Sequence, residues 1–217
     1  MICAVLFDLD GVLVDTNALH FLAWKELADH LGIPFTPEQG NRCRGISRMA
    51  SLEIVLEQAD RTYTQAEKEQ FAAEKNRRYQ SMLEDLTPGH TTPGAGSVLQ
   101  ELKRRGYRLA LASGSKNAAL ILARTGLDRW LDAVADGTLI TRSKPDPEVF
   151  LTAAGLLGVP PQQCAGVDDA LAGIQAAKSA GMMTVAFGEA ALHRAGEHNI
   201  QTLEELLPLF PFLEATP

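Results

Sequence analysis

Cysteine, positive charge and long apolar runs are all scarce in this sequence. Its three scattered cysteines, Cys3, Cys43 and Cys164, do not make a disulfide framework, so we expect a protein of the reducing cytoplasm. The net charge of −7 argues against nucleic acid and against an anionic membrane as general partners. No apolar run approaches the length of a membrane span, and the N-terminus lacks the basic stretch of a signal peptide.

The residues that are present indicate an ordinary globular protein with a core. Hydrophobic residues make up 46% of the 217 residues and charged residues 22%, so the chain can bury a sizeable apolar surface. The length allows one domain with a large insertion or two small domains. Because the chain is acidic, an anionic substrate would need a local basic site.

Residues 17–85 carry the signals of consecutive helices. Apolar residues recur with helical spacing along the first part of this stretch. Side chains suited to cap a helix N-terminus follow at Thr36, Ser47 and Thr64. A turn-rich segment over 87–94 then ends the pattern. We therefore predict a nearly all-helical unit.

A different pattern surrounds this unit, in which strands alternate with helices. The predicted strands cover 2–9, 108–112, 133–135, 164–167 and 184–187. The predicted helices cover 98–105, 117–125, 147–157, 170–180 and 203–207. This alternation implies right-handed crossovers and a parallel sheet covered on both faces. We predict an α/β fold, with a Rossmann-like parallel sheet core from residues 1–15 and 87–217 and an inserted α-helical cap domain over 16–86.

Two carboxylates follow directly on the first predicted strand. Asp8 and Asp10 are two residues apart, so on an extended chain their side chains point to the same side. Gly11 comes next, where the backbone must turn close to whatever is bound. Open parallel sheets bind ligands at the carboxyl ends of their strands, and two close carboxylates favour a divalent cation between them. The alternative is a pair of loop acids that cap a nearby helix.

Three further strand or loop ends carry polar side chains. Ser113 leads from a strand into a helix, which is a suitable anion site. Lys144 precedes a helix in a proline-rich turn, and Asp168 and Asp169 end another strand. These acids, with the first pair, offer the oxygen ligands that Mg²⁺ prefers. Taken alone, Ser113 is equally compatible with an ordinary turn, and a lone lysine such as Lys144 is more often a solvated charge.

The segment FDLDGVLVDT resembles the first motif of the haloacid dehalogenase-like (HAD) phosphotransferases, and Ser113, Lys144 and Asp168-Asp169 resemble the later motifs in order. The resemblance implies that Asp8 is the phosphorylated nucleophile and Asp10 the general acid/base. It also implies that the serine and the lysine hold the transferring phosphoryl oxygens. One Mg²⁺ per active site would be bound by Asp8, Asp10, Asp168 and Asp169. Mutases of this family usually have Glu-Asp in the fourth motif, so Asp168 is expected to reach the metal either directly or through water.

The predicted cap resembles the β-phosphoglucomutase subfamily more narrowly. The resemblance implies substrate-binding roles for His20, Trp24, Gly45, Ile46, Ser47, Arg48, Ser51, Lys75, Asn76, Gly114, Ser115, Lys116 and Asn117. Among these, Arg48 and residues 115–117 would hold the phosphate that is not being transferred. Arg42, Arg44 and Arg48 form a local basic cluster in the sequence, which suits a phosphate dianion.

Several of these cap residues have simpler interpretations. His20 is also compatible with an ordinary, partly buried histidine, and Lys75 with a charge on a helix surface. Trp24 is compatible with the cap core rather than with stacking on a sugar. Arg42 is expected to be solvated.

The resulting functional hypothesis is a Mg²⁺-dependent phosphomutase. It would interconvert β-glucose 1-phosphate and glucose 6-phosphate through an aspartyl-phosphate enzyme, with glucose 1,6-bisphosphate as the activating intermediate. We expect a monomer, with residues 15–17 and 86–93 as the hinges of a closing cap. One alternative is a sugar-phosphate phosphatase with the same core, and another is a catalytically inactive binding module.

Overall fold

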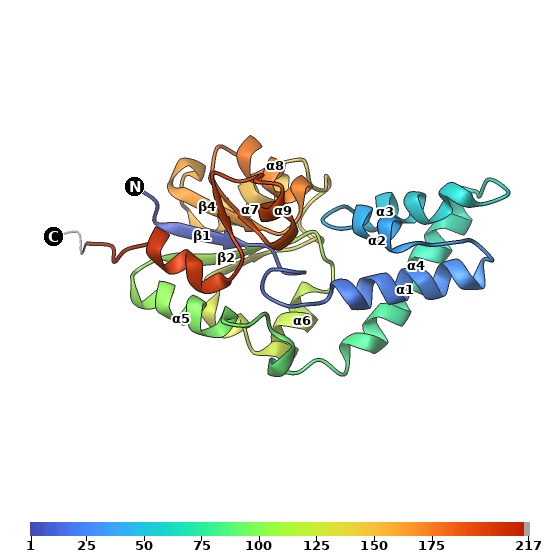
Figure 1. The fold of residues 1–217 in the computed structure, drawn as a ribbon, viewed down its shortest axis with the longest axis horizontal. Coiled ribbons are helices and arrows are strands. Elements are labelled where there is room, and N and C mark those ends of the chain that lie inside the picture. Colours follow the sequence, from blue (N-terminus) through green and yellow to red (C-terminus); the bar gives the residue numbers. More distant parts are fainter. Residues whose placement is uncertain (215–217) are drawn as a thin grey trace.

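The computed structural model describes residues 1–214, and its centre is a parallel six-stranded sheet (Figure 1). The strands follow the order β3-β2-β1-β4-β5-β6 across the sheet. Their bounds are β1 (Ala4–Phe7), β2 (Arg108–Ala112), β3 (Ala133–Ala135), β4 (Cys164–Asp168), β5 (Met183–Phe187) and β6 (His198–Ile200). The first strand lies between β2 and β4, which places its carboxyl end at the middle of the sheet.

Helices cover both faces of the sheet, as predicted. They are α5 (Ala95–Arg104), α6 (Ala118–Thr125), α7 (Glu148–Leu157), α8 (Leu171–Ser179) and the short α9 (Gly188–Leu192). Figure 1 shows α5 and α6 below the sheet and α7 and α8 above it. Along β1, Val5 and Phe7 belong to the apolar cluster that includes Leu99 of α5, whereas Leu6 belongs to the cluster that includes Phe150 of α7. This alternation is the two-residue period of a strand buried on both faces.

A second group of helices is inserted after β1 and lies beside the sheet (Figure 1). It consists of α1 (Asn17–His30), α2 (Pro37–Arg42), α3 (Arg48–Val55) and α4 (Gln65–Leu83). These helices have an apolar cluster of their own, which includes Trp24, Leu27 and Leu52. The predicted caps are present, because Thr36, Ser47 and Thr64 each accept a backbone N–H of the following helix.

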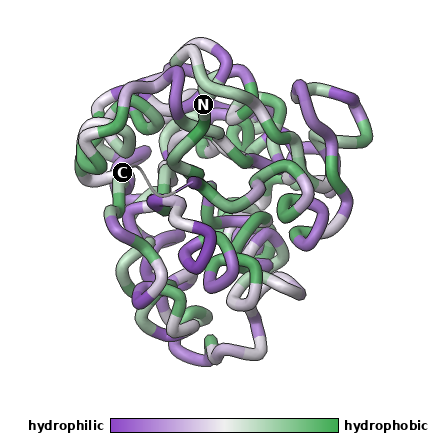
Figure 2. Tube along the Cα trace, turned by 90° about the vertical axis from the view of Figure 1, so that its left-hand side faces the viewer, coloured by the Kyte–Doolittle hydropathy of each residue, from purple (hydrophilic) through white to green (hydrophobic). Residues whose placement is uncertain are grey.

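Helix α5, which leads from this insertion back to the sheet, is clearly amphipathic. In α5 the buried residues Ala95, Val98, Leu99 and Leu102 recur at helical spacing, whereas Glu101 and Arg104 form an ion pair on the other side. Figure 2 shows hydrophobic and hydrophilic stretches alternating along the outer helices in the same way. None of the helices in residues 1–214 combines the length and the apolar character that crossing a membrane requires.

The structure differs from the predicted elements mainly near the C-terminus. Strand β6 and helix α9 were not predicted, and residues 203–209 form a 3-10 helix where a short helix was expected over 203–207. Pro208 lies inside that last helix, and a residue without an N–H cannot extend an α-helical hydrogen-bond ladder.

Candidate active site

Asp8 lies where β1 ends, in a buried ion-pair network with a lysine. The ammonium of Lys144 donates to Asp8 Oδ1 at 2.6 Å and to Asp168 Oδ2 at 2.7 Å. The Lys144 side chain is only 1% exposed, so its interpretation as a solvated charge is wrong. Burial raises the pKa of Asp8 well above its usual value, although the charge of Lys144 acts in the opposite direction.

A trio of carboxylates meets at this edge of the sheet. One oxygen each of Asp8, Asp168 and Asp169 lies within 4.8 Å of the others, and all three residues are buried. Burial, followed by the charge of Asp168, raises the pKa of Asp169 to about 7. Lys144 alone would not balance the three carboxylates in their ionised form, so the trio has the composition of a divalent-cation site.

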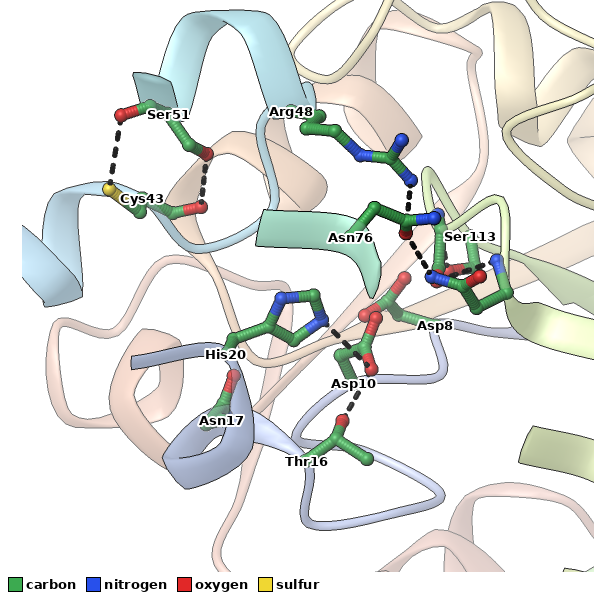
Figure 3. A network of polar contacts seen from close by, with 12 residues as sticks. Asp8, Asp10, Thr16, Asn17, His20, Cys43, Arg48, Ser51, Asn76 and Ser113 are labelled. Atoms are coloured by element: carbon green, nitrogen blue, oxygen red, sulfur yellow. Dashed lines mark hydrogen bonds and ion pairs between the residues drawn. The ribbon is translucent and has the colours of Figure 1, made fainter. Parts of the chain in front are cut away.

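The carboxylate of Asp10 lies outside the trio and points toward the first cap helix (Figure 3). It accepts the hydroxyl hydrogen of Thr16 and lies 3.6 Å from His20 Nε2. Burial by itself would raise the pKa of Asp10, but His20, Thr16 and Lys75 together lower it. Asp10 is therefore ionised and able to accept a proton. Its role as a metal ligand stays a prediction.

Lys75 of α4 is buried next to His20 among aromatic rings. Its ammonium lies 2.9 Å from His20 Nδ1, and 4.4 Å and 4.8 Å from the ring centres of Tyr79 and Trp24. Burial, and then the charge of Arg48, lowers the pKa of Lys75 to about 7. Lys75 is 3% exposed, so it is not a charge on a helix surface. Trp24 is equally buried and belongs to the apolar cluster of the cap, with its ring against Lys75.

The side chains predicted to hold the second phosphate come from both parts of the fold. Arg48 of α3 donates to Asn76 Oδ1 at 2.8 Å, and Asn117, just before α6, donates to the same oxygen at 3.0 Å. Ser113 is buried at the end of β2, where its hydroxyl accepts the N–H of Ser115.

The three arginines of the sequence cluster do not act together, because Arg42 pairs with Glu57 and Arg44 with Glu189.

The loop between α2 and α3 brings the cap close to the fourth motif. Gly45 has a φ of +70°, and a Cβ built there would lie 3.0 Å from the Cβ of Ala170. Ser51 is 3% exposed and donates to the carbonyl of Cys43, which fixes the start of α3 (Figure 3). Burial raises the pKa of the Cys43 thiol to about 11, so this cysteine is not a reactive thiolate.

One cavity of about 880 Å³ joins these groups between the inserted helices and the core. Its lining includes every predicted site residue except Asp168 and Asp169: Asp8, Asp10, His20, Trp24, Gly45, Ile46, Ser47, Arg48, Ser51, Lys75, Asn76, Ser113, Gly114, Ser115, Lys116, Asn117 and Lys144. Asp169 lines a smaller neighbouring cavity with Gly11, Asn17 and Arg44. Asp8 and Asp10 of the core and the polar side chains of the cap thus face one cavity.

Comparison with known proteins agrees with this arrangement. The model of the haloacid dehalogenase-like hydrolases matches residues 2–181. The chain belongs to this family. Among curated HAD relatives, the β-phosphoglucomutase of Bacillus subtilis is 47% identical over 188 residues, which cover 86% of this chain and 83% of that protein. The phosphorylated carbohydrates phosphatase of Thermotoga maritima is 32% identical over 182 residues and covers 82% of each chain.

A solved structure of the HAD family extends the likeness to the cap. The crystal structure of a β-phosphoglucomutase from Clostridium difficile superposes with a TM-score of 0.90 at 37% identity, and covers 95% of this chain and 94% of that one. The likeness therefore includes both the sheet and the inserted helices.

Four residues that contact the groups of this HAD site are not indicated by the sequence motifs. Thr16 binds Asp10, Asn17 donates to Asp169 Oδ2 at 3.3 Å, and Gln80 donates to Asn117 Oδ1 at 2.9 Å. Tyr79 stacks on His20 with ring centres 4.0 Å apart, and its buried hydroxyl has no hydrogen-bond partner among residues 1–214. Thr16 was the most predictable of the four from the sequence, because it is the last residue of the first motif and directly precedes a helix.

Proposed function

We propose that this chain is a β-phosphoglucomutase that interconverts β-glucose 1-phosphate and glucose 6-phosphate through glucose 1,6-bisphosphate. One observation supports this above the others: a single cavity offers phosphate-binding groups from the cap as well as from the core. Asp8, Ser113 and Lys144 suit the transferring phosphoryl group, and Arg48 and Asn117 suit a second phosphate. A sugar that carries a phosphate at either end needs both sets. The 47% identity to a β-phosphoglucomutase supports the same assignment.

In the proposed reaction, phosphorylated Asp8 gives its phosphoryl group to a hydroxyl of the sugar phosphate. The bond from phosphorus to the sugar oxygen forms as the bond to Asp8 breaks, and Asp10 takes the proton of that hydroxyl. The bisphosphate then binds in the opposite orientation, Asp8 attacks its other phosphorus, and Asp10 returns the proton to the leaving oxygen. Lys144 and Ser113 hold the transferring phosphoryl oxygens throughout.

One Mg²⁺ per site fits the carboxylate trio, whose charge Lys144 does not balance. When bound, it neutralises charge between the carboxylates and the phosphoryl group. Both oxygens of Asp168 already accept hydrogen bonds, one from Lys144 and one from the N–H of Ala170. We therefore propose that Asp8 and Asp169 provide the main protein oxygens and that Asp168 mainly orients Lys144.

We propose residues 16–86 as a cap that closes over the substrate and keeps water away from phosphorylated Asp8. The two connections between this segment and the core lie side by side, because Thr92 donates its N–H to the carbonyl of Leu13 and Asp15 donates to that of His90. Paired connections of this kind suit a hinge.

The competing candidate is a phosphatase, since a 32% identical relative bears that name. The test uses purified protein with Mg²⁺, β-glucose 1-phosphate and a trace of glucose 1,6-bisphosphate, and follows glucose 6-phosphate and inorganic phosphate together. We expect fast formation of glucose 6-phosphate with little free phosphate. Phosphate release without isomerisation would make the chain a phosphatase, and activity in the Asp8→Asn protein would contradict the nucleophile assignment.

A further inference from the structure

A relay of three side-chain amides connects the cap helix α4 with the core. Asn117 of the core lies between Asn76 and Gln80, which are four residues apart and therefore on one face of α4. Gln80 Nε2 donates to Asn117 Oδ1 at 2.9 Å, and Asn117 Nδ2 donates to Asn76 Oδ1 at 3.0 Å. Asn117 is only 7% exposed, whereas Gln80 is at the surface.

The direction of this amide relay is fixed by an arginine at its end. A guanidinium can only donate, so the Asn76 atom that lies 2.8 Å from Arg48 must be the amide oxygen. Asn117 must then present its NH₂ group to that oxygen and its own oxygen to Gln80. Gln80 in turn must present its NH₂ group, because an oxygen there would face another oxygen.

This orientation leaves a hydrogen-bond donor at the cavity. Asn76 lines the cavity, and its oxygen already accepts two hydrogen bonds (Figure 3). Its amide nitrogen has no hydrogen-bond partner among residues 1–214 and is a donor suited to an anion. A reversed relay would present an oxygen there and repel the same anion.

We propose that Gln80 is a positioning residue for substrate binding, which acts through Asn117 to hold the NH₂ group of Asn76 toward the phosphate that is not being transferred. The inference rests on the proposed function for the identity of that anion. Gln80 itself does not line the cavity, so it contributes to binding only through the relay. Its hydrogen bond joins the inserted helices to the core and forms when the two are close together.

The test compares Gln80→Leu with the wild-type protein. We expect KM for the sugar phosphate to rise about fivefold, the size that one partly exposed hydrogen bond provides, while kcat stays within about twofold. Gln80→Lys keeps a donor and should restore most of the affinity. Gln70 is an exposed glutamine of the same helix, and Gln70→Leu and Gln70→Lys control for apolarity and for charge. An unchanged KM in Gln80→Leu would overturn the proposal.

A double-mutant cycle separates the relay from a general effect on cap closure. If Gln80 acts through Asn76, then Gln80→Leu adds no further increase in KM in an Asn76→Ala background. Effects that multiply would overturn the orienting role.

Two measurements distinguish a failure of this proposal from a failure of the proposed function. The products of the wild-type protein decide between mutase and phosphatase, whereas the ratio of variant to wild-type KM on the same substrate decides the role of Gln80. Calorimetric Kd values for glucose 6-phosphate, measured in an Asp8→Asn background, should show the same fivefold ratio without any turnover.

Discussion

Lys144 illustrates how a single buried side chain combines stability with chemistry. It pairs with two buried carboxylates at once, with Nζ–O distances of 2.6 Å to Asp8 and 2.7 Å to Asp168. Removing one partner of a buried ion pair leaves the remaining charges uncompensated, which costs far more than loss of a surface pair. In the proposed reaction the same ammonium holds a phosphoryl oxygen next to Asp8.

We expect Lys144→Met to abolish turnover and to lower the free energy of unfolding by roughly 3–5 kcal/mol. Urea unfolding followed by circular dichroism measures the second effect. Lys25→Met is the matched control, because Lys25 forms an exposed pair with Asp29 on α1, and its loss should cost less than about 0.5 kcal/mol. Equal losses in the two variants would contradict the buried network.

A second prediction at the residue scale concerns Lys75, whose pKa burial lowers from its usual 10.5 to about 7. Between these two values the unfolded chain binds a proton that the folded protein does not bind. The free energy of unfolding therefore rises with pH across this window, by about 1.4 kcal/mol per pH unit, relative to a Lys75→Met variant that lacks the titration. Urea unfolding of both proteins at pH 6, 7.5 and 9 tests this. A difference that stays constant with pH would mean that Lys75 remains protonated when folded.

At the scale of elements, the turn after β1 depends on glycine. Gly11 has a φ of +87°, and a Cβ there would lie 2.2 Å from an Asp169 carboxylate oxygen. The turn therefore brings the end of the first strand against the end of the fourth, where any larger residue would displace an acid of the trio.

We expect Gly11→Ala to weaken Mg²⁺ activation by about tenfold or more, in addition to destabilising the fold. Gly32 provides the control, since its φ is +70° and nothing lies within 4 Å of a Cβ built there. Gly32→Ala should cost about 1 kcal/mol of stability and leave the Mg²⁺ dependence of the rate unchanged. If the Mg²⁺ dependence of the rate is the same in the two variants, the close contact between Gly11 and Asp169 does not determine the geometry of the site.

The helices and strands also show how much of the fold can be predicted from the sequence. The strands β1, β2, β4 and β5 were predictable because each is a buried apolar run bounded by turn signals, and the capped helices because their caps are local. Strand β6 (His198–Ile200) was missed because two of its three residues, His198 and Asn199, are polar, whereas the equally short edge strand β3 (Ala133–Ala135) is apolar throughout. The residues of the candidate site likewise divide into those that the local sequence predicts and those that depend on tertiary packing. Strand-end acids are visible in the sequence, whereas the contacts of Tyr79 and Gln80 depend on how α4 meets α1 and the core.

The proposed metal site depends on the whole molecule, since its carboxylates follow β1 and lie at the end of β4. A cation that binds only the folded protein raises the free energy of unfolding by mass action. We expect Mg²⁺ at about 100 times its Kd to add about 2.7 kcal/mol, and a chelator to remove this gain together with the activity. Thermal unfolding with and without Mg²⁺ measures it.

Two variants identify which carboxylates provide that gain. Asp169→Asn removes a member of the trio, so its thermal midpoint should no longer rise with Mg²⁺. The Asp10 carboxylate instead contacts Thr16 and His20, so Asp10→Asn should lose turnover but keep the Mg²⁺-dependent rise. If Asp10→Asn loses the rise as well, the Asp10 carboxylate is a metal ligand, as the sequence predicts. Cap closure would then have to turn that side chain toward Asp8, and the contact with Thr16 would belong to the state before closure.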